Sequence, residues 1–463
     1  MVAIYNSFTR KKEPFTPIEP KKIRMYVCGM TVYDYCHIGH ARVMVVFDMV
    51  SRYLRSIGFD LLYVRNITDI DDKIIERANS NKESITDLTN RFIEEMNKDA
   101  KALGVISPDL EPRATEHMAE IIEMISQLIK KEYAYLGSNG DVYFNVASFD
   151  SYGKLSGKNI EELRAGERVE VQKEKNDPLD FVLWKSAKKN EPSWPSPWGD
   201  GRPGWHIECS AMSVHCLGSH FDIHGGGQDL QFPHHENEIA QSVCSTGGKF
   251  ANVWMHNGFV RVDEEKMSKS LGNFFTIKEV LKKYQPEVIR FFILSSHYRS
   301  PLNYSAGNLD EARSSLSRLY TALKESNSGN VGATDQDFIA QFNSYMDDDF
   351  NTPKAISLLH EIAGKINRIK DESPQDSERL AATLKRLGSI LGLLESKPQD
   401  FLQGKNDENI TSVDSKKIDQ LINERNIARH EKDYAKADKI RQQLIELDVT
   451  LEDTEDGTDW RRN

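Results

Sequence analysis

The sequence lacks the features that would place the protein in a membrane or on the secretory route. Nowhere in its 463 residues do about 18 apolar residues follow one another, the length that a membrane-spanning helix requires. The first residues, MVAIYNSFTRKKEPF, lack the apolar core of a signal peptide. We therefore expect a cytoplasmic protein that does not associate with membranes.

Positive charge is also scarce, since 60 Lys and Arg stand against 71 Asp and Glu and give a net charge of −11. This balance argues against a broad nucleic-acid-binding surface, although a large protein can keep a local basic face. The C-terminal stretch is the candidate for such a face, with Lys416, Lys417, Arg425, Arg429, Lys432, Lys436, Lys439 and Arg441. Glu and Asp are interspersed there, so an ordinary solvated helix face is an equal alternative.

Cysteine is rare, with five residues: Cys28, Cys36, Cys209, Cys216 and Cys244. In a cytoplasmic protein we expect reduced thiols, most of them small buried apolar side chains. Internal repeats and low-complexity tracts are absent too. A chain of this length predicts three or more structural units of about 100–200 residues each.

Two parts of the sequence, about 22–75 and about 204–295, alternate apolar strand-like runs with helical periodicity, as α/β domains do. The run Val43–Ile57 predicts a helix that Gly58 ends. The predicted strands are Met25–Cys28, Asp60–Arg65, Phe221–His224 and Val253–Phe259.

The segment between these parts, Arg113–Trp198, has a different pattern and predicts an insertion. It contains a predicted helix at Glu116–Lys131, a hairpin around Leu136–Asp141 and a turn-forming stretch, Pro192–Pro203, that returns the chain to the sheet.

Helical patterns dominate from Asn308 onward. The polar stretch Ser396–Asp414 is typical of a linker, and two further helices are expected at Ser415–Arg429 and Tyr434–Leu447.

Two short strings predict phosphate binding. His37-Ile38-Gly39-His40 lies between a predicted strand and a predicted helix, where free backbone N–H groups and the helix dipole favour an anion. Lys266-Met267-Ser268-Lys269-Ser270 places two lysines, three residues apart, in a polar loop. Either string alone is explained by helix capping or by solvated lysines, but their joint occurrence favours a phosphate site.

The string Phe232–Glu238 is rich in metal-ligand side chains, and His234 and Glu238 share one face of the helix predicted after Pro233. Two thiolates would complete a tetrahedral zinc set, and Cys28 and Cys209 are the candidates. His206, His224, His235 and Glu236 remain competing ligands. The alternative for His235 and Glu236 is an exposed first helical turn.

Four longer strings resemble the cysteinyl-tRNA synthetase family, and the two phosphate strings resemble the signature motifs of class I aminoacyl-tRNA synthetases. The four strings are Met25–Asp34, Asn66–Lys73, Gly204–Met212 and His224–Gly227 with His234–Glu238. The resemblance spans essentially the whole chain and assigns one zinc ion to Cys28, Cys209, His234 and Glu238.

The resemblance implies an α/β fold: a Rossmann-type parallel-sheet catalytic domain split by an insertion, then an α-helical bundle and a small C-terminal anticodon-recognition domain. The predicted boundaries are 1–112 and 201–250 for the catalytic domain, 113–200 for the insertion, 251–307 for a stem-contact region with the Lys266–Ser270 loop, 308–400 for the bundle and 401–463 for the C-terminal domain.

The reaction that the resemblance implies joins L-cysteine to cysteine tRNA through cysteinyl-adenylate, with Mg²⁺ accompanying ATP and with the chain acting as a monomer. A hydrophobic pocket separates cysteine from serine by only about 1–3 kcal/mol, whereas zinc prefers a thiolate. The insertion is too short for an editing domain, which agrees with selection by zinc.

Residue roles also follow from the resemblance. His37, Gly39, His40, Lys266 and Lys269 are expected at the ATP phosphates, and Gly226 and Asp229 at the nucleotide. Gly29, Thr68, Trp205 and His224 are expected around the amino acid.

Two residues depart from the family pattern, Val43 in place of a small hydroxyl residue and Glu264 in place of a glycine. Two alternatives remain: a ligase that joins cysteine to an amino-sugar by the same adenylate chemistry, and a non-enzymatic zinc–thiolate sensor or RNA-binding module. The terminal Trp460-Arg461-Arg462 and the helical region favour tRNA.

Overall fold

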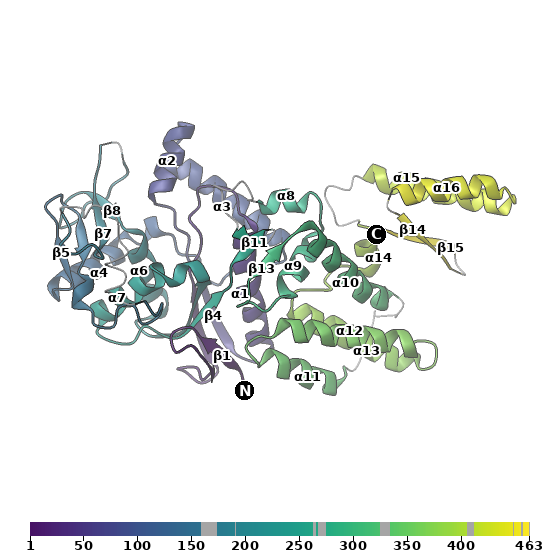
Figure 1. Cartoon of the computed structure of the whole chain (residues 1–463), viewed down its shortest axis with the longest axis horizontal. Coiled ribbons are helices and arrows are strands. Elements are labelled where there is room, and N and C mark those ends of the chain that lie inside the picture. The colour runs from purple at the N-terminus through teal and green to yellow at the C-terminus, as the bar shows by residue number, and fades with distance from the viewer. Residues whose placement is uncertain are drawn as a thin grey trace.

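The structure, a computed structural model, describes residues 1–158, 174–189, 191–262, 265–266, 275–324, 334–404, 412–447, 449–454 and 457–462 (Figure 1). For 265–266, 412–416, 452–454, 457 and 462 it describes the backbone alone. Among the helices within these ranges, none combines the length and the apolar character that crossing a bilayer would require.

A parallel four-stranded sheet lies at the centre, in the order β10-β9-β3-β4. Its strands are β3 (Lys22–Val27), β4 (Asp60–Arg65), β9 (Phe221–Gly227) and β10 (Ala251–Asn257). All four predicted strands are present, each shifted by a few residues at most. Because β9 and β3 are neighbours, the two halves of the sequence form one sheet, which confirms the split Rossmann-type fold.

The two faces of this sheet belong to different cores, since successive side chains of a strand point to opposite faces. Met25 and Val27 pack with helix α1 (Ile38–Ser56), whereas Tyr26 and Cys28 pack with α6 (Trp205–Leu217) and α7 (His234–Thr246). The sheet thereby has α1 on one face and the helices that carry the candidate metal ligands on the other.

The insertion forms its own antiparallel sheet in the order β5-β6-β7-β8. The predicted hairpin is confirmed, because β5 and β6 pair around it. The expectation that Pro192–Pro203 consists of turns is wrong at its end, where Gly201–Pro203 pairs with β7. The bounds are α4 (Met118–Lys130), β5 (Ala134–Leu136), β6 (Val142–Phe144), β7 (Phe181–Ser186) and β8 (Gly201–Pro203).

Smaller elements surround the central sheet. A hairpin of β1 (Ala3–Asn6) and β2 (Lys11–Pro14) lies beside β10, and β13 (Leu302–Tyr304) pairs with β11 (Val260–Val262), which also pairs with β12 (Glu265–Lys266). The remaining helices of this half are α2 (Asp72–Asn81), α3 (Ile85–Ala102), α8 (Ile277–Leu281) and α9 (Pro286–Leu294).

The expected helical bundle consists of α10 (Ala306–Lys324), α11 (Gln336–Met346), α12 (Thr352–Ile369) and α13 (Pro374–Ile390). The predicted linker Ser396–Asp414 is partly wrong. Pro398–Leu402 forms α14, because Phe401 and Leu402 are apolar and buried. The rest of that stretch from 405 to 411 lies outside the described residues.

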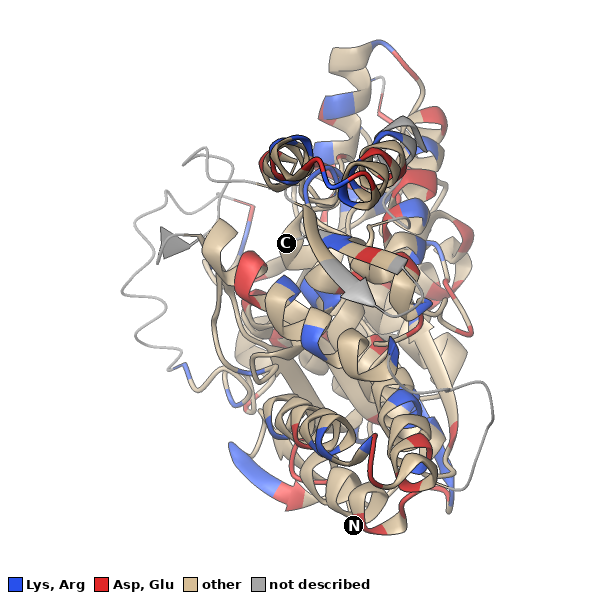
Figure 2. Ribbon diagram, turned by 90° about the vertical axis from the view of Figure 1, so that its right-hand side faces the viewer, with Lys and Arg blue, Asp and Glu red and all other residues tan. Residues whose placement is uncertain are grey.

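The C-terminal region projects from the far end of the molecule (Figure 1). It contains the two predicted helices, α15 (Ser412–His430) and α16 (Tyr434–Glu446), and a hairpin of β14 (Val449–Thr454) and β15 (Gly457–Arg462). Its own small core includes Ile422, Leu444 and Trp460. Figure 2, which faces this end, shows basic and acidic residues interspersed, so neither sign of charge forms a continuous face here.

Candidate metal and nucleotide site

The four residues predicted to bind metal meet between the sheet and its two covering helices. Cys28 directly follows β3, Cys209 lies on α6, and His234 and Glu238 lie one turn apart on α7. Their ligand atoms all lie within 4.8 Å of one another, and all four side chains are buried. Glu238 Oε1 lies 3.2 Å from Cys28 Sγ and 3.1 Å from His234 Nε2.

A second group overlaps this set: Cys28, His224, His235 and Glu238 also lie within 4.8 Å of one another. Two other competing ligands lie outside both groups. His206 contacts a member of the predicted set, since its Nδ1 lies 2.8 Å from His234 Nδ1, and Glu236 accepts a 2.9 Å hydrogen bond from the backbone N–H of Ser156. His235 and Glu236 are fully buried, so the alternative of an exposed first turn is wrong.

Burial, hydrogen bonds and neighbouring charges shift the pKa values of the four residues in the predicted set. A hydrogen bond with Cys28 lowers the pKa of Cys209 to about 7, while burial raises the pKa of Cys28 itself. Burial acts to lower the pKa of His234, but Glu238 and Cys209 together outweigh it and raise that pKa to about 10. Burial acts to raise the pKa of Glu238, but His224 and His234 hold it well below its usual value.

This donor set fits a soft divalent cation. Two sulfurs, an imidazole and a carboxylate are the ligand types that zinc binds tetrahedrally, at about 2.0–2.3 Å each, and such ligands lie within 4.8 Å of one another. In addition, His235 Nε2 and His224 Nδ1 are buried without a hydrogen-bond partner among the described residues. The chain therefore offers a buried Cys/His/Glu group that can hold a metal ion.

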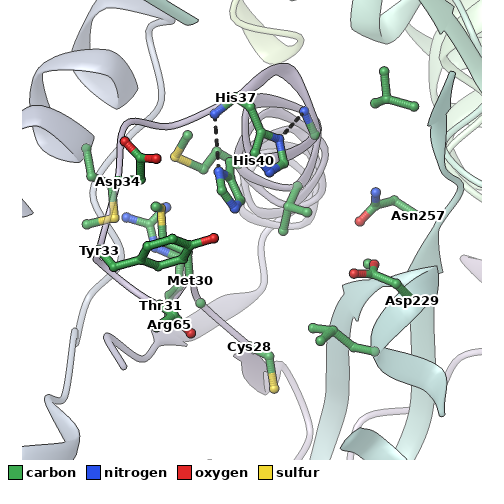
Figure 3. A pocket seen from close by; sticks show the side chains of 18 of the residues that line it. Cys28, Met30, Thr31, Tyr33, Asp34, His37, His40, Arg65, Asp229 and Asn257 are labelled. Atoms are coloured by element: carbon green, nitrogen blue, oxygen red, sulfur yellow. Dashed lines mark hydrogen bonds between the residues drawn. The ribbon is translucent and has the colours of Figure 1, made fainter. Parts of the chain in front are cut away.

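A cavity of about 420 Å³ opens next to this set, and the predicted phosphate string lines it (Figure 3). His37 is the N-cap of α1, and its Nδ1 accepts a 3.0 Å hydrogen bond from the N–H of Gly39. His40 Nδ1 accepts from the N–H of His37 at 3.2 Å, and the two rings stack with centroids 3.6 Å apart. Because both Nδ1 atoms accept, each neutral ring carries its proton on Nε2.

Cys28 and Trp205 join the cavity to the metal-type set. Cys28 belongs to both, and Trp205 lines the cavity while its ring centroid lies 4.3 Å from that of His234. Trp205 is 39% exposed, which is unusual for so large a side chain beside a buried cluster. Cys28 and the phosphate string therefore line the same cavity.

The other predicted residues divide into two groups. Gly29, Gly39 and Asp229 line the cavity, whereas Thr68, His224 and Gly226 are not among its lining residues. Lys266 is placed only through the backbone of β12, and Lys269 and Glu264 lie outside the described residues. Val43, the other departure from the family pattern, lines the cavity.

Close packing within the protein explains why several positions are glycine, whether or not a ligand is bound. A Cβ at Gly29 would lie 1.8 Å from the carbonyl oxygen of Asn66, and one at Gly225 would lie 2.3 Å from the Phe47 ring. A Cβ at Gly226 would meet His235 and Leu230 at 3.0 Å. These glycines are required by the contacts of β3 and β9 with their neighbours.

Sequence reasoning assigned no role to several residues that line the cavity: Lys73 and, labelled in Figure 3, Tyr33, Asp34, Arg65 and Asn257. Part of the signal was available, since Arg65 and Asn257 are the last residues of β4 and β10, and parallel sheets bind ligands at the carboxyl ends of their strands.

Comparisons with known proteins agree with this arrangement. The chain matches the family models of the tRNA synthetases class I (C) catalytic domain over residues 14–314, the DALR domain over 341–395 and the cysteinyl-tRNA ligase anticodon binding domain over 415–461. The match to an anticodon binding domain favours a tRNA ligase over the two alternatives, an amino-sugar ligase and a non-enzymatic sensor.

Relatives of the same length are similar throughout. The cysteine–tRNA ligase of Methylococcus capsulatus is 61% identical over 466 residues and that of Thioalkalivibrio sulfidiphilus 60% over 462 residues, each with 100% of both chains covered. Among solved structures, methionyl-tRNA synthetase of Mycobacterium tuberculosis in complex with methionyl-adenylate shares the fold, with a TM-score of 0.56 and 14% identity over 80% of this chain and 89% of that one. The chain therefore belongs to the cysteine–tRNA ligase family of class I aminoacyl-tRNA synthetases.

Proposed function

We propose that the chain activates L-cysteine with ATP to form cysteinyl-adenylate and transfers the cysteinyl group to the 3′ end of cysteine tRNA. One observation carries this proposal: Cys28 belongs both to the buried metal-type set and to the cavity lined by the phosphate string. A single small molecule can therefore present its side chain to one and its carboxylate to the other.

In the first step the carboxylate of cysteine attacks the α-phosphate of ATP and pyrophosphate leaves. The nucleophile belongs to the substrate, so the protein contributes position and charge stabilisation. The Nε2–H groups of His37 and His40 are donors for phosphate oxygens at the start of α1, where the helix dipole also favours negative charge. Lys266 and Lys269 supply positive charge to the leaving pyrophosphate, and Mg²⁺ accompanies ATP.

Around the nucleotide, Asp229 and Gly39 line the cavity, whereas Gly226 is not among its lining residues. Asp229 accepts hydrogen bonds from the nucleotide or from the substrate ammonium.

Cysteine is selected at the buried set. Cys28, Cys209, His234 and Glu238 hold zinc, which when bound supplies a thiophilic ligand position that takes the substrate thiolate and refuses a serine hydroxyl. Trp205 covers this position from the cavity side, Gly29 lines the cavity, and Thr68 and His224 support the pocket without lining it.

Transfer to tRNA involves the remaining units. Residues 251–307 contact the tRNA stem, and the C-terminal region, with α15 and α16 at the far end, recognises the anticodon. The predicted domain boundaries stand as part of this proposal. The chain acts as a cytoplasmic monomer.

Amino-acid-dependent pyrophosphate exchange, with cysteine and serine side by side and metal analysis of the same sample, tests the proposal. We expect exchange with cysteine alone and one zinc per chain. Charging of purified tRNA separates it from the amino-sugar alternative, and exchange without charging would contradict the tRNA half. Absence of exchange with both amino acids would contradict the whole proposal.

A further inference from the structure

Tyr26 lies on the same sheet face as the metal-type set, two residues before Cys28 on β3. It is in register with His224 of β9, and the two rings stack with centroids 5.4 Å apart at 17°. The ring is fully buried between the sheet and the core that contains Cys28 and Cys209.

The environment of the Tyr26 hydroxyl is unusual. The hydroxyl is buried and makes no hydrogen bond of ordinary geometry within the described ranges. A buried hydroxyl without a partner loses its hydrogen bonds to water and gains none in return, so the position calls for an acceptor. Cys209, Cys28 and Glu238 act on it electrostatically, and of these Cys209 also lies within reach of a weak hydrogen bond with the hydroxyl.

We infer that Tyr26 is a positioning residue whose hydroxyl donates a hydrogen bond to the Cys209 sulfur when that sulfur is a metal-bound thiolate. The inference rests on the metal set of the proposed function. Metal binding removes the proton from both cysteines and turns each sulfur into a better acceptor, so the buried hydroxyl gains a partner as the set is filled.

Cys209 is the favoured acceptor because the other sulfur is already engaged. Cys28 Sγ lies 3.2 Å from Glu238 Oε1 and 3.6 Å from His224 Nε2. Tyr26 also stays a donor at neutral pH, because an ordinary tyrosine hydroxyl ionises only near a pKa of about 10.

A donor to a ligating thiolate has two consequences. It fixes the orientation of the ligand, which strengthens metal binding, and it draws charge from the sulfur. Less charge on Cys209 leaves the ion more open to a further thiolate, so Tyr26 would favour capture of the substrate sulfur.

The test is Tyr26→Phe, which keeps the ring and removes the donor. Tyr53→Phe is the matched control, because Tyr53 is also buried but donates its hydroxyl to Asp347 at 2.8 Å, away from the set. Competition with a chromogenic zinc chelator measures affinity in the full chain. We expect about a tenfold loss for Tyr26→Phe, at the lower end of outer-shell effects, and no change for Tyr53→Phe.

Cobalt-substituted protein gives a second measurement that does not depend on activity. Loss of the donor raises the energy of the sulfur lone pairs, so the sulfur-to-cobalt charge-transfer band moves to lower energy in Tyr26→Phe. If this variant does not fold, fluorinated tyrosine at position 26, a stronger donor, should move the band to higher energy instead.

Failure of the metal set and failure of the Tyr26 role give different results. Wild-type protein that binds neither zinc nor cobalt would overturn the metal set, and the role of Tyr26 with it. Wild-type protein that binds the ion, with equal affinity and an unmoved band after the change at position 26, would overturn the role of Tyr26 alone.

Discussion

Asp48 of α1 and Arg290 of α9 form an ion pair in which each side chain is only 1% exposed. Arg290 also donates to the carbonyl oxygen of Leu391 at 2.7 Å, and Asp48 accepts from Arg52 at 2.8 Å. The pair therefore connects the helix that begins with the phosphate string to α9 and to the residues that follow α13.

Asp48→Ala should destabilise the protein strongly. Removing one partner of a buried ion pair leaves an uncompensated charge and costs about 3–5 kcal/mol. Urea unfolding measures this, with Asp310→Ala as the control, because Asp310 pairs with Arg313 at the surface and its side chain is 53% exposed. The control should lose less than about 1 kcal/mol; equal losses in the two variants would contradict the importance of burial.

Arg42→Lys should impair the first reaction step. The Arg42 guanidinium is fully buried and donates to five carbonyl oxygens, those of Gly258, Phe259, His297, Tyr298 and Ser300. Burial lowers its pKa to about 10, so it stays charged at neutral pH. It holds the cavity wall at residues 258–260 against α1, and Lys cannot reach all these acceptors.

We expect at least about a tenfold loss in kcat/KM for ATP in pyrophosphate exchange, equivalent to about 1.4 kcal/mol. Arg55→Lys is the control on the same helix, because Arg55 pairs with Asp109 at the surface. An unchanged kcat/KM in Arg42→Lys would show that the wall does not depend on this guanidinium.

Cys209→Ser should remove the metal. Changes beside a metal ligand already lower affinity by about 10–100-fold, and loss of a ligating sulfur costs more. The KM for cysteine should rise together with the loss of zinc. Cys216→Ser, on the same helix but outside the set, should keep both values; an unchanged zinc content in Cys209→Ser would refute the metal assignment.

Glu287 should make the stability of the protein depend on pH. Burial raises its pKa to about 7, and it accepts hydrogen bonds from Tyr320 and from the N–H of Leu394. A raised folded-state pKa favours folding at low pH, and this contribution is lost as pH rises from about 4.5 to about 7.

Relative to Glu287→Gln, which cannot ionise, the wild type should lose about 2 kcal/mol of stability between pH 5 and pH 8. Urea unfolding of both proteins at both values measures the difference. A constant difference would mean that Glu287 does not titrate in this range.

A chain that ends at Gly404 should still form the adenylate but should charge tRNA poorly. The C-terminal region has its own core and contacts the rest through a few polar pairs, such as Lys324 with Asp459 at 2.5 Å. We expect pyrophosphate exchange within about twofold of the full chain, because the cavity and the metal-type set lie outside this region. A twofold change corresponds to about 0.4 kcal/mol in the activation barrier. Full charging by the shortened chain would refute the role of this region.

Much of the fold and the metal-type set could be predicted from the sequence, for definite reasons. Apolar runs identified β3, β4, β9 and β10, and the spacing of His234 and Glu238 placed them on one helix face. The cavity wall at Arg65 and Asn257 was not predicted, because it depends on which strands are neighbours. Gly29 was expected around the amino acid, whereas tertiary packing against Asn66 requires a glycine there, and packing against Phe47 requires one at position 225.

The split sheet has a consequence for the synthesis of the protein on the ribosome. Cys28 and Glu238 meet at 3.2 Å although 210 positions separate them along the chain. A ribosome that adds about 5–20 residues per second needs roughly 10–40 s to pass from one to the other. Throughout that interval Cys28 lacks the last of its predicted partners, so the metal-type set is completed late in biosynthesis, after the insertion has been translated.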